Sequence, residues 1–324
     1  MKDISHYFHH IARNCKPGYH RLCRGIWADV EWFDSLYPSD RFLIRSLAFG
    51  LACPRAGDPA RVLCAASAAV VLGLPLQFYP VRAEWMAAYN RRKPTYQTRK
   101  LLNRPSGRVQ SIETPLGPVL VSSIAEACID VARYHGLADG LVAADFALEN
   151  RMIEQDDLVT IAEESRASHG IERARALCLM ATRGCESPRE SWLKYLLFAY
   201  GFPAPTVQLT VLDSCFYQIG RGDTVYEDHS IVLEYDGGEK YDGTYGPLAE
   251  VLQKERRRER ALHNEGMDIL RFDKESIARE TWVDELKRMM KRGKPFPHEQ
   301  LLGGYKPVFP PVTPELLSTP DRDL

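Results

Sequence analysis

A short apolar run that ends in acidic residues and a pair of glycines constrains this chain more than any other feature. The run from Ile231 to Leu233 passes directly into Glu234 and Asp236, with one tyrosine between them, and then into Gly237. This pattern is typical of a buried strand that ends in a turn. Because side chains alternate between the two faces of a strand, we expect the carboxylates of Glu234 and Asp236 on the same face.

A third carboxylate belongs to the same prediction. Asp223 lies eleven residues before Glu234, near the end of another extended run. A hairpin between the two runs would bring its carboxylate beside the pair. Because clustered carboxylates repel one another and a hard divalent cation relieves that repulsion, we expect this cluster to bind Mg2+ or Mn2+.

The composition excludes some classes of protein. The chain has 324 residues and a formal net charge of -1, so contact with nucleic acid would require a local basic patch. The longest apolar stretch, from Val62 to Leu76, is interrupted by serine and glycine and is too short for a bilayer. The N-terminus shows no cleavable apolar leader, and the eight cysteines form no Cys-x-x-Cys pair. We therefore expect a cytoplasmic protein with reduced thiols and no membrane contact.

Hydrophobic periodicity predicts a mixed fold, α+β or α/β, with two domains. Helical spacing dominates the domain expected over residues 1–168, and shorter extended runs between 76 and 120 predict a small sheet among its helices. These helices are expected over residues 40–51, 60–72, 123–135, 140–150 and 156–168. Residues 169–292 follow the order helix, three strands, helix, strand, helix. Residues 293–324 are rich in proline, which favours a tail that is extended on the surface or disordered.

The second domain has clear boundary signals. Ser187 is the expected N-cap of a helix, with Pro188 at its first position and Glu190 at its third, and Gly201 is expected to end it. The remaining elements are strands over 207–212, 215–223, 230–236 and 267–272, and helices over 248–265 and 276–291.

Several segments of this domain resemble the PD-(D/E)XK nuclease superfamily, and more closely its branch related to very-short-patch-repair (Vsr) endonucleases. They are SPRESWLKYLL, PTVQLTV, RGD with IVLEYDG and the following KY, and KERRRERALHNEGMDILRF. The resemblance implies a restriction-endonuclease-like αβββαβ fold and a Mg2+-dependent endodeoxyribonuclease. It implies that Asp223 and Glu234 bind the metal, with the backbone carbonyl of Tyr235 as a further ligand. Asp236 replaces the lysine of the superfamily, as in the Vsr-related branch, so Lys240 is the residue expected to reach a phosphate.

Each residue of this cluster also has a simpler interpretation. Glu190 completes a capping box, so helix capping explains it as well as a catalytic or metal-supporting role does. Asp236 forms a common turn pair with the glycine that follows, and Asp223 follows a glycine in what could equally be a solvent loop. Lys240 is equally consistent with a solvated lysine. Glu234 is harder to explain without a site, because an acid directly after three apolar strand residues would be partly buried and would need a partner.

Segments nearer the N-terminus resemble the AbiEi antitoxin family of type IV toxin-antitoxin systems. The matching segments are RLCRGIW, RVLCAASAAVVLGLP and VLVSSIAEACIDVARYHGLADGLVAADFAL. The resemblance implies an N-terminal winged helix followed by a mostly helical domain. Because the residues before Arg24 are too few for the usual winged helix, we expect a truncated remnant of it.

Two basic segments are candidates for nucleic-acid binding. Arg256 and Arg260 share one face of the helix expected over 248–265, where they would either contact phosphates or only increase solubility. The second segment interleaves basic and aromatic residues between 82 and 108, and it is either a phosphate-binding surface or a solvated loop. Its basic residues are Arg82, Arg91, Arg92, Lys93, Arg99, Lys100, Arg104 and Arg108.

One expected function and two alternatives follow from these features. We expect a metal-dependent DNA endonuclease that hydrolyses phosphodiester bonds, with defence against foreign DNA as the setting that the resemblance implies. The first alternative is a non-catalytic, DNA-binding regulator of the antitoxin type that uses the nuclease fold as a scaffold. The second is a subunit that acts with a protein partner or as a homodimer.

Overall fold

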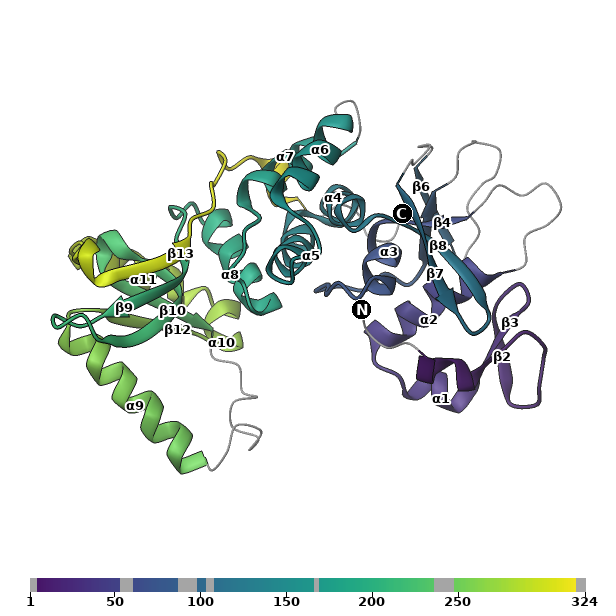
Figure 1. The fold of residues 1–324 in the computed structure, drawn as a ribbon, viewed down its shortest axis with the longest axis horizontal. Helices are drawn as coiled ribbons and strands as arrows, with labels where there is room; N and C mark the ends of the chain where they lie inside the picture. The colour runs from purple at the N-terminus through teal and green to yellow at the C-terminus, as the bar shows by residue number, and fades with distance from the viewer. Residues whose placement is uncertain are drawn as a thin grey trace. The chain divides into compact units, whose positions relative to one another are not determined.

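The computed structural model describes residues 5–52, 61–86, 98–102, 108–165, 169–235 and 248–318. The chain forms two compact units. The first consists of Met1–Cys178 together with Thr313–Leu324, and the second of Leu179–Val312. The C-terminal residues therefore return to the unit in which the chain begins (Figure 1).

The first unit starts with a small antiparallel sheet. Its strands are β1 (Ile11–Ala12), β2 (Tyr19–Cys23) and β3 (Ile26–Asp29), in the order β1-β3-β2, and they follow the 3-10 helix η1 (Ser5–His10). Asp29 then caps helix α1 (Val30–Ser35) by accepting a hydrogen bond from the backbone of Trp32, and α2 (Pro38–Leu51) follows. Helix α2 begins two residues before the predicted start and ends where it was predicted, at Leu51.

A five-stranded mixed sheet forms the middle of the first unit. Its strands are β4 (Val62–Leu63), β5 (Ala83–Met86), β6 (Thr98–Leu102), β7 (Val109–Thr114) and β8 (Gly117–Ser122), in the order β6-β5-β4-β8-β7. One predicted helix, over residues 60–72, is wrong in its first half, where β4 stands, and α3 (Ala65–Val71) forms only the remainder. The reason lies in Glu84 of β5, which accepts the backbone hydrogen bond of Ala66 and so supports a helix start at that point.

Helices complete the first unit. They are α4 (Ile124–His135), α5 (Leu137–Glu149), α6 (Gln155–Glu164), α7 (Ile171–Met180) and α12 (Pro314–Leu317). Ser123 and Glu126 form a reciprocal capping box at the start of α4. Helix α4 is buried from Ala125 to His135, and its charged face is buried too, where Arg133 forms an ion pair with Asp130 at 2.8 Å.

The second unit is a mixed sheet with helices on both faces. Its elements are α8 (Pro188–Ala199), β9 (Thr206–Leu212), β10 (Gln218–Tyr226), η2 (Glu227–His229), β11 (Ile231–Tyr235), α9 (Leu248–Asn264), β12 (Asp268–Phe272), α10 (Lys274–Ala278), α11 (Thr281–Arg292), η4 (His298–Gln300) and β13 (Leu301–Tyr305). The strand order is β12-β11-β10-β9-β13, and only the β11–β12 pair is parallel. Strands β9, β10 and β11 thus form an antiparallel meander, and α9 connects β11 to the parallel β12.

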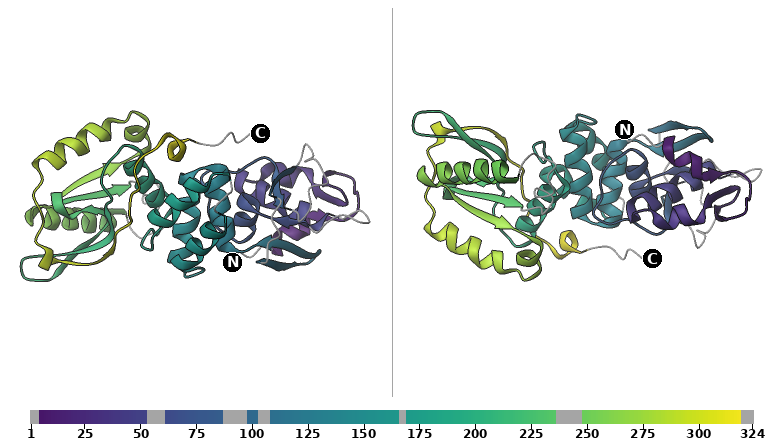
Figure 2. Two further views of the ribbon diagram at one scale, coloured as in Figure 1. Left: turned by 90° about the horizontal axis from the view of Figure 1, so that it is seen from above. Right: turned by 90° about the horizontal axis from the view of Figure 1, so that it is seen from below.

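Apolar side chains attach the helices to the two faces of this sheet. Leu197 of α8 and Trp282 of α11 pack with Leu233 on one face. Leu262 of α9 packs with Val232 on the other face. Figure 2 shows the strands between these helices. Alternate residues of β11 therefore belong to opposite core clusters, as expected for a central strand that is covered on both sides.

Three features of the second unit differ from the sequence prediction. Strand β10 begins and ends three residues later than the predicted 215–223, so Asp223 lies inside it. The single closing helix predicted over 276–291 is interrupted, because Glu280 has a left-handed φ of 56° between α10 and α11. The proline-rich segment after residue 292 contributes strand β13 to the sheet edge and buries Phe296 in the core under α9. Proline limits the hydrogen bonds that a segment makes, but the proline-free stretch from Leu301 to Tyr305 can still pair with β9.

Two general properties can be read from the described residues. None of the helices there combines the length and the apolar character that a membrane span requires. The seven cysteines in this part of the chain are all free thiols.

Candidate active site

Strands β10 and β11 separate from each other at one point, and this fork defines the candidate site. Their antiparallel pairing runs from Tyr226 and Ile231 as far as Thr224 and Leu233. Beyond that point β10 continues only along β9, through Gly222, whereas β11 continues only along β12. The pairing between β10 and β11 therefore ends at this point, and the two strand segments beyond it are the arms of the fork.

The first residues of the two arms are the two acids that the sequence singled out. Asp223 directly precedes Thr224 on the β10 arm, and Glu234 directly follows Leu233 on the β11 arm. Glu234 is only 5% exposed. The predicted hairpin between the two runs is therefore present, and it places an acid on each side of the fork. The expected burial of Glu234 is confirmed.

Arg258 of α9 spans the fork between these arms. Its Nη2 atom donates hydrogen bonds to Oε1 of Glu234 and, at 3.1 Å, to the backbone carbonyl of Arg221. A Cβ atom on Gly220 would lie 3.2 Å from Nε of Arg258, so glycine at that position leaves room for the arginine stem. Burial acts to lower the pKa of Arg258. The negative charges of Glu234, Glu255 and Asp223 outweigh the effect of burial, so the pKa of Arg258 is raised.

A second arginine, Arg271 of β12, also compensates Glu234. It lies directly beside Glu234 in the parallel register, and its Nη2 atom is 3.5 Å from Oε2 of that acid. The same guanidinium contacts Glu255 at 2.9 Å and also Glu259, both on α9. Glu255 and Glu259 are thus directed at the sheet, where they form a charge network with the two arginines of the fork.

Glu190 of α8 belongs to the same region but is held mainly by helix capping. Its backbone N–H donates to the Ser187 hydroxyl at 3.3 Å, and its carboxylate accepts from that hydroxyl and from the backbone of Glu186. Gln208 of β9 donates a further hydrogen bond to Oε2 of Glu190 at 3.3 Å. Burial raises the pKa of Glu190, and the charge of Asp223 adds to the increase, whereas the hydrogen bonds from Ser187 and Glu186 oppose it. The Ser187 cap is therefore present, but the predicted capping box is not reciprocal, because the Glu190 carboxylate accepts from the backbone of Glu186 rather than from that of Ser187. Glu190 is at the same time coupled electrostatically to Asp223.

Gln208 is a strained residue that the sequence did not indicate. It has a left-handed φ of 55° in the middle of β9, and it is 8% exposed. Its Oε1 atom is buried without a hydrogen-bond partner among the described residues. Non-glycine residues with such a backbone cost about 1–3 kcal/mol and occur preferentially at functional sites.

The oxygen donors at the fork suit a hard divalent cation, with one condition. Asp223 and Glu234 offer carboxylate oxygens from the two arms, which is the ligand type that Mg2+ and Mn2+ prefer. Within the residues that the structure describes, no three His, Cys, Asp or Glu side chains lie close enough together to hold a metal ion. Asp236, the third acid of the predicted cluster, lies outside them. The condition for cation binding is that the ion pair between Arg258 and Glu234 breaks, so that the carboxylate of Glu234 can bind the cation instead.

Several residues from the sequence prediction cannot be placed at the fork. Asp236, Lys240, Arg91, Arg92 and Lys93 lie outside the described residues. Strand β6 includes Arg99 and Lys100, whose side chains are likewise not described. Tyr235 ends β11, and its ring faces the core side with α8 and α11, where the guanidinium of Arg189 lies 5.3 Å from the ring centre.

The outer face of α9 carries positive charge that no described acid neutralises. Arg256, Arg257 and Arg260 are exposed or partly exposed, and none of them forms an ion pair within the described chain. The reason is local, because two acids of this helix, Glu255 and Glu259, contact Arg258 and Arg271 instead. The predicted pair Arg256 and Arg260 therefore belongs to a larger basic face.

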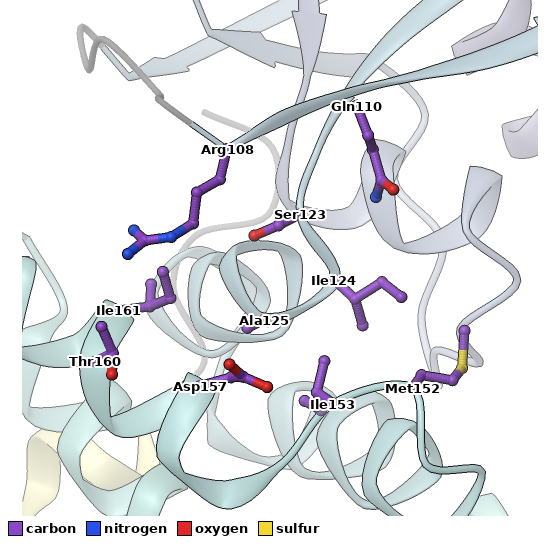
Figure 3. Close-up of a pocket in the computed structure, with 10 residues that line it drawn as sticks. All are labelled: Arg108, Gln110, Ser123, Ile124, Ala125, Met152, Ile153, Asp157, Thr160 and Ile161. Carbon is purple, nitrogen blue, oxygen red and sulfur yellow. The ribbon is translucent and has the colours of Figure 1, made fainter.

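A pocket of about 290 Å3 in the first unit is a weaker candidate (Figure 3). It is lined by the residues Arg108, Gln110, Ser123, Ile124, Ala125, Met152, Ile153, Asp157, Thr160 and Ile161. Its charged groups already have partners: Arg108 donates to Glu164 through both terminal nitrogens, and Asp157 accepts from the backbone of Glu154. With its charges used in this way, the pocket has no group directed at a ligand.

Sequence reasoning missed Arg258 and Gln208. Arg258 lies in the basic run 254–260, but linear sequence does not show which of its arginines faces the sheet. A usable signal is the position of Gly220 and Gly222 around the strand end, because glycines there indicate close approach by another group. No comparable signal marks Gln208.

Comparison of this chain with protein-family models, with curated proteins and with solved structures gives no significant match. The residues and their geometry are therefore the basis for assigning a function.

Proposed function

We propose that this protein is a divalent-metal-dependent DNA endonuclease whose site is the β10–β11 fork. The observation that carries the proposal is the placement of Asp223 and Glu234 at the start of the two arms, with Glu190 coupled electrostatically to Asp223. The strand order supports it too, because the αβββαβ order of the second unit is the one implied by the resemblance to PD-(D/E)XK nucleases.

The proposed reaction adds water across a phosphorus–oxygen bond. The water oxygen bonds to phosphorus, the ester bond to one sugar oxygen breaks, and that oxygen takes a proton and leaves as a hydroxyl. A divalent cation at the fork would supply Lewis-acid activation of the phosphodiester. Asp223 and Glu234 would hold this cation, with Glu190 as a supporting acid.

DNA is the proposed partner because of the basic face on α9. Arg256, Arg257 and Arg260 present uncompensated positive charge on the same helix that sends Arg258 into the fork. Neutralising phosphates releases counterions and binds nucleic acid without regard to sequence. We further propose that the first unit is an AbiEi-like domain in a cytoplasmic protein that defends against foreign DNA.

The first test is a cleavage assay with isosteric variants of the two acids. We expect the wild-type protein to cut plasmid and oligonucleotide DNA with Mg2+ or Mn2+ and to stop with EDTA. Asp223→Asn and Glu234→Gln should each reduce cleavage by at least about 100-fold, because an amide is a poor ligand for a hard cation. Both variants should also bind Mn2+ more weakly in calorimetric titrations.

Matched controls are available at exposed positions of the same unit. Asp228 is an exposed residue of η2, just after the end of β10, and Glu275 is an exposed residue of α10. The control variants are Asp228→Asn and Glu275→Gln. Both should cleave like the wild type. Equal cleavage by Asp223→Asn and Asp228→Asn would remove the fork from the proposal.

One observation favours a second candidate function. Glu234 is already paired with Arg258 and Arg271, so its charge is compensated without a metal. A scaffold that binds DNA without cutting it, such as an antitoxin-type regulator, would need only these ion pairs and no metal. For that function we expect DNA binding that does not change with EDTA and no cleavage with either cation.

A further inference from the structure

The guanidinium of Arg258 contacts both arms of the fork. It bonds the backbone carbonyl of Arg221 on one arm and the carboxylate of Glu234 on the other. Its Nη1 atom donates to Glu255 at 3.2 Å. These three hydrogen bonds leave donors at Nε and Nη1 without a partner among the described residues.

The exposure of this side chain differs from that of the acid it holds. The side chain of Arg258 is 24% exposed and that of Glu234 is 7% exposed. The side chain of Arg258 is therefore more accessible to an anion from solvent than the carboxylate of Glu234 is.

We propose that Arg258 is the phosphate-binding residue of the site, and that it exchanges its carboxylate partner Glu234 for a DNA phosphate when a divalent cation takes that carboxylate. The inference rests on the proposed function and adds the group that recognises the substrate. Arginine suits this role because its planar donors match carboxylate and phosphate oxygens equally well.

The exchange has an electrostatic reason. A cation bound to Glu234 would repel Arg258 and remove one of the two carboxylates that now pair with it. The loss of a carboxylate partner is unfavourable for a half-buried guanidinium, and an arriving phosphodiester restores the balance of charge. Cation binding and phosphate binding therefore favour each other, and by linkage each increases the affinity of the other by the same factor.

The test measures Mn2+ affinity and cleavage separately in Arg258→Met. Methionine keeps an unbranched stem without the charge, so the cation no longer has to compete with Arg258 for the carboxylate of Glu234. We expect Mn2+ to bind this variant several-fold more tightly than the wild type in the absence of DNA. We also expect cleavage at saturating Mn2+ to fall by at least about 100-fold, because the phosphate loses its arginine.

A third measurement tests the coupling directly. A duplex with phosphorothioate linkages, which resist hydrolysis, should increase the Mn2+ affinity of the wild-type protein by about 5-fold or more. In Arg258→Met this increase should be absent. Arg288→Met is the matched control, because Arg288 is an exposed arginine of α11 on the opposite face of the sheet, and this variant should keep the coupling.

Any combination of results other than the expected one overturns the proposal. Faster cleavage by Arg258→Met would make Arg258 only a block on the site, and unchanged cleavage with unchanged coupling would give it no role. Weaker Mn2+ binding together with lost cleavage would mean that Arg258 merely supports Glu234. Arg258→Lys retains the charge and should keep part of the coupling, so it serves if circular dichroism shows that the methionine variant does not fold.

The proposed function fails in a different way. If the wild-type protein neither binds Mn2+ nor cleaves DNA, the metal-dependent activity is wrong. If the wild type cleaves and Arg258→Met cleaves equally well, only the role of Arg258 is wrong.

Discussion

Glu190 shows how one side chain serves both a helix end and a charged site. It closes the capping contacts at the start of α8, and it lies within electrostatic reach of Asp223. Because burial and the neighbouring acid disfavour its ionised form, Glu190 holds its proton more tightly in the folded chain than in the unfolded one. Its ionisation therefore opposes folding.

The pH dependence of stability tests this property of Glu190. A carboxyl with a raised pKa contributes its full stabilisation of the folded state at low pH, where it is protonated. This stabilisation is lost as the pH rises above 4.5, the ordinary pKa of a glutamate. Glu190→Gln removes the titration. We expect the melting temperature of the wild type to fall relative to this variant as pH increases from 4 to 7.

Calorimetric or fluorescence melts at several pH values measure that difference. Glu275→Gln, an exposed acid on α10, should show no such trend relative to the wild type. A constant difference between wild type and Glu190→Gln across this range would show that Asp223 and burial do not disfavour the charge of Glu190.

At the scale of elements, α9 divides its charges between two faces. Two of its acids, Glu255 and Glu259, contact Arg258 and Arg271 at the sheet, whereas Arg256, Arg257 and Arg260 remain on the outside. The same helix packs Leu262 into the core beside β11. The sequence run of mixed charge thus becomes a neutralised inner face and a basic outer face.

The salt dependence of DNA binding tests the outer face of α9. Replacing Arg256, Arg257 and Arg260 together with glutamine should weaken binding to all sequences alike. The slope of log affinity against log salt should decrease by about 0.9 for each phosphate contact that is lost. Fluorescence anisotropy with a labelled duplex at several salt concentrations measures the slope.

A second basic helix provides the comparison. Lys287, Arg288 and Lys291 are exposed on α11, which packs on the opposite face of the sheet from α9. The triple glutamine variant at these positions should leave the slope unchanged. A decrease in the slope of the α11 variant and none in the α9 variant would assign DNA binding to the opposite face. The role of Arg91, Arg92 and Lys93 stays a prediction, which the same measurement on their triple variant tests.

At the scale of the whole molecule, α12 near the C-terminus belongs to the same unit as the N-terminal residues. Arg173 of α7, which is 6% exposed, donates to the carbonyl of Glu315 and to the hydroxyl of Ser318. Leu316 of α12 is buried as well. These contacts tie the C-terminal residues to the unit that the N-terminal residues begin.

Shortening the chain after Val312 tests how much this return contributes. The truncation removes two hydrogen bonds from a buried guanidinium, which costs about 1–3 kcal/mol, and the burial of Leu316, which contributes about 1.5–3 kcal/mol. We expect the first unit to melt at a lower temperature and the second unit to melt as before. Differential scanning calorimetry resolves the two effects, and truncation after Ser318, which keeps all these contacts, is the control. Equal melting of the first unit in both truncated chains would contradict the prediction.

Local sequence signals predicted much of the second unit. Ser187, Pro188 and Glu190 mark the start of α8 because capping depends on side chains within one turn. The apolar run before Glu234 predicts β11, because two covered faces require apolar residues at successive positions. Similar signals predicted α9 and β12 within one residue at each end.

Tertiary structure decided the features that depend on residues far apart in the chain. The break at Glu280, the pairing of β13 with β9 and the start of α3 against Glu84 each need a distant partner. The same holds for the fork. The acids Asp223 and Glu234 could be named from the sequence because they follow local strand patterns, but only the folded chain shows that Arg258 crosses between them, since a helix in sequence does not reveal which of its residues faces the sheet.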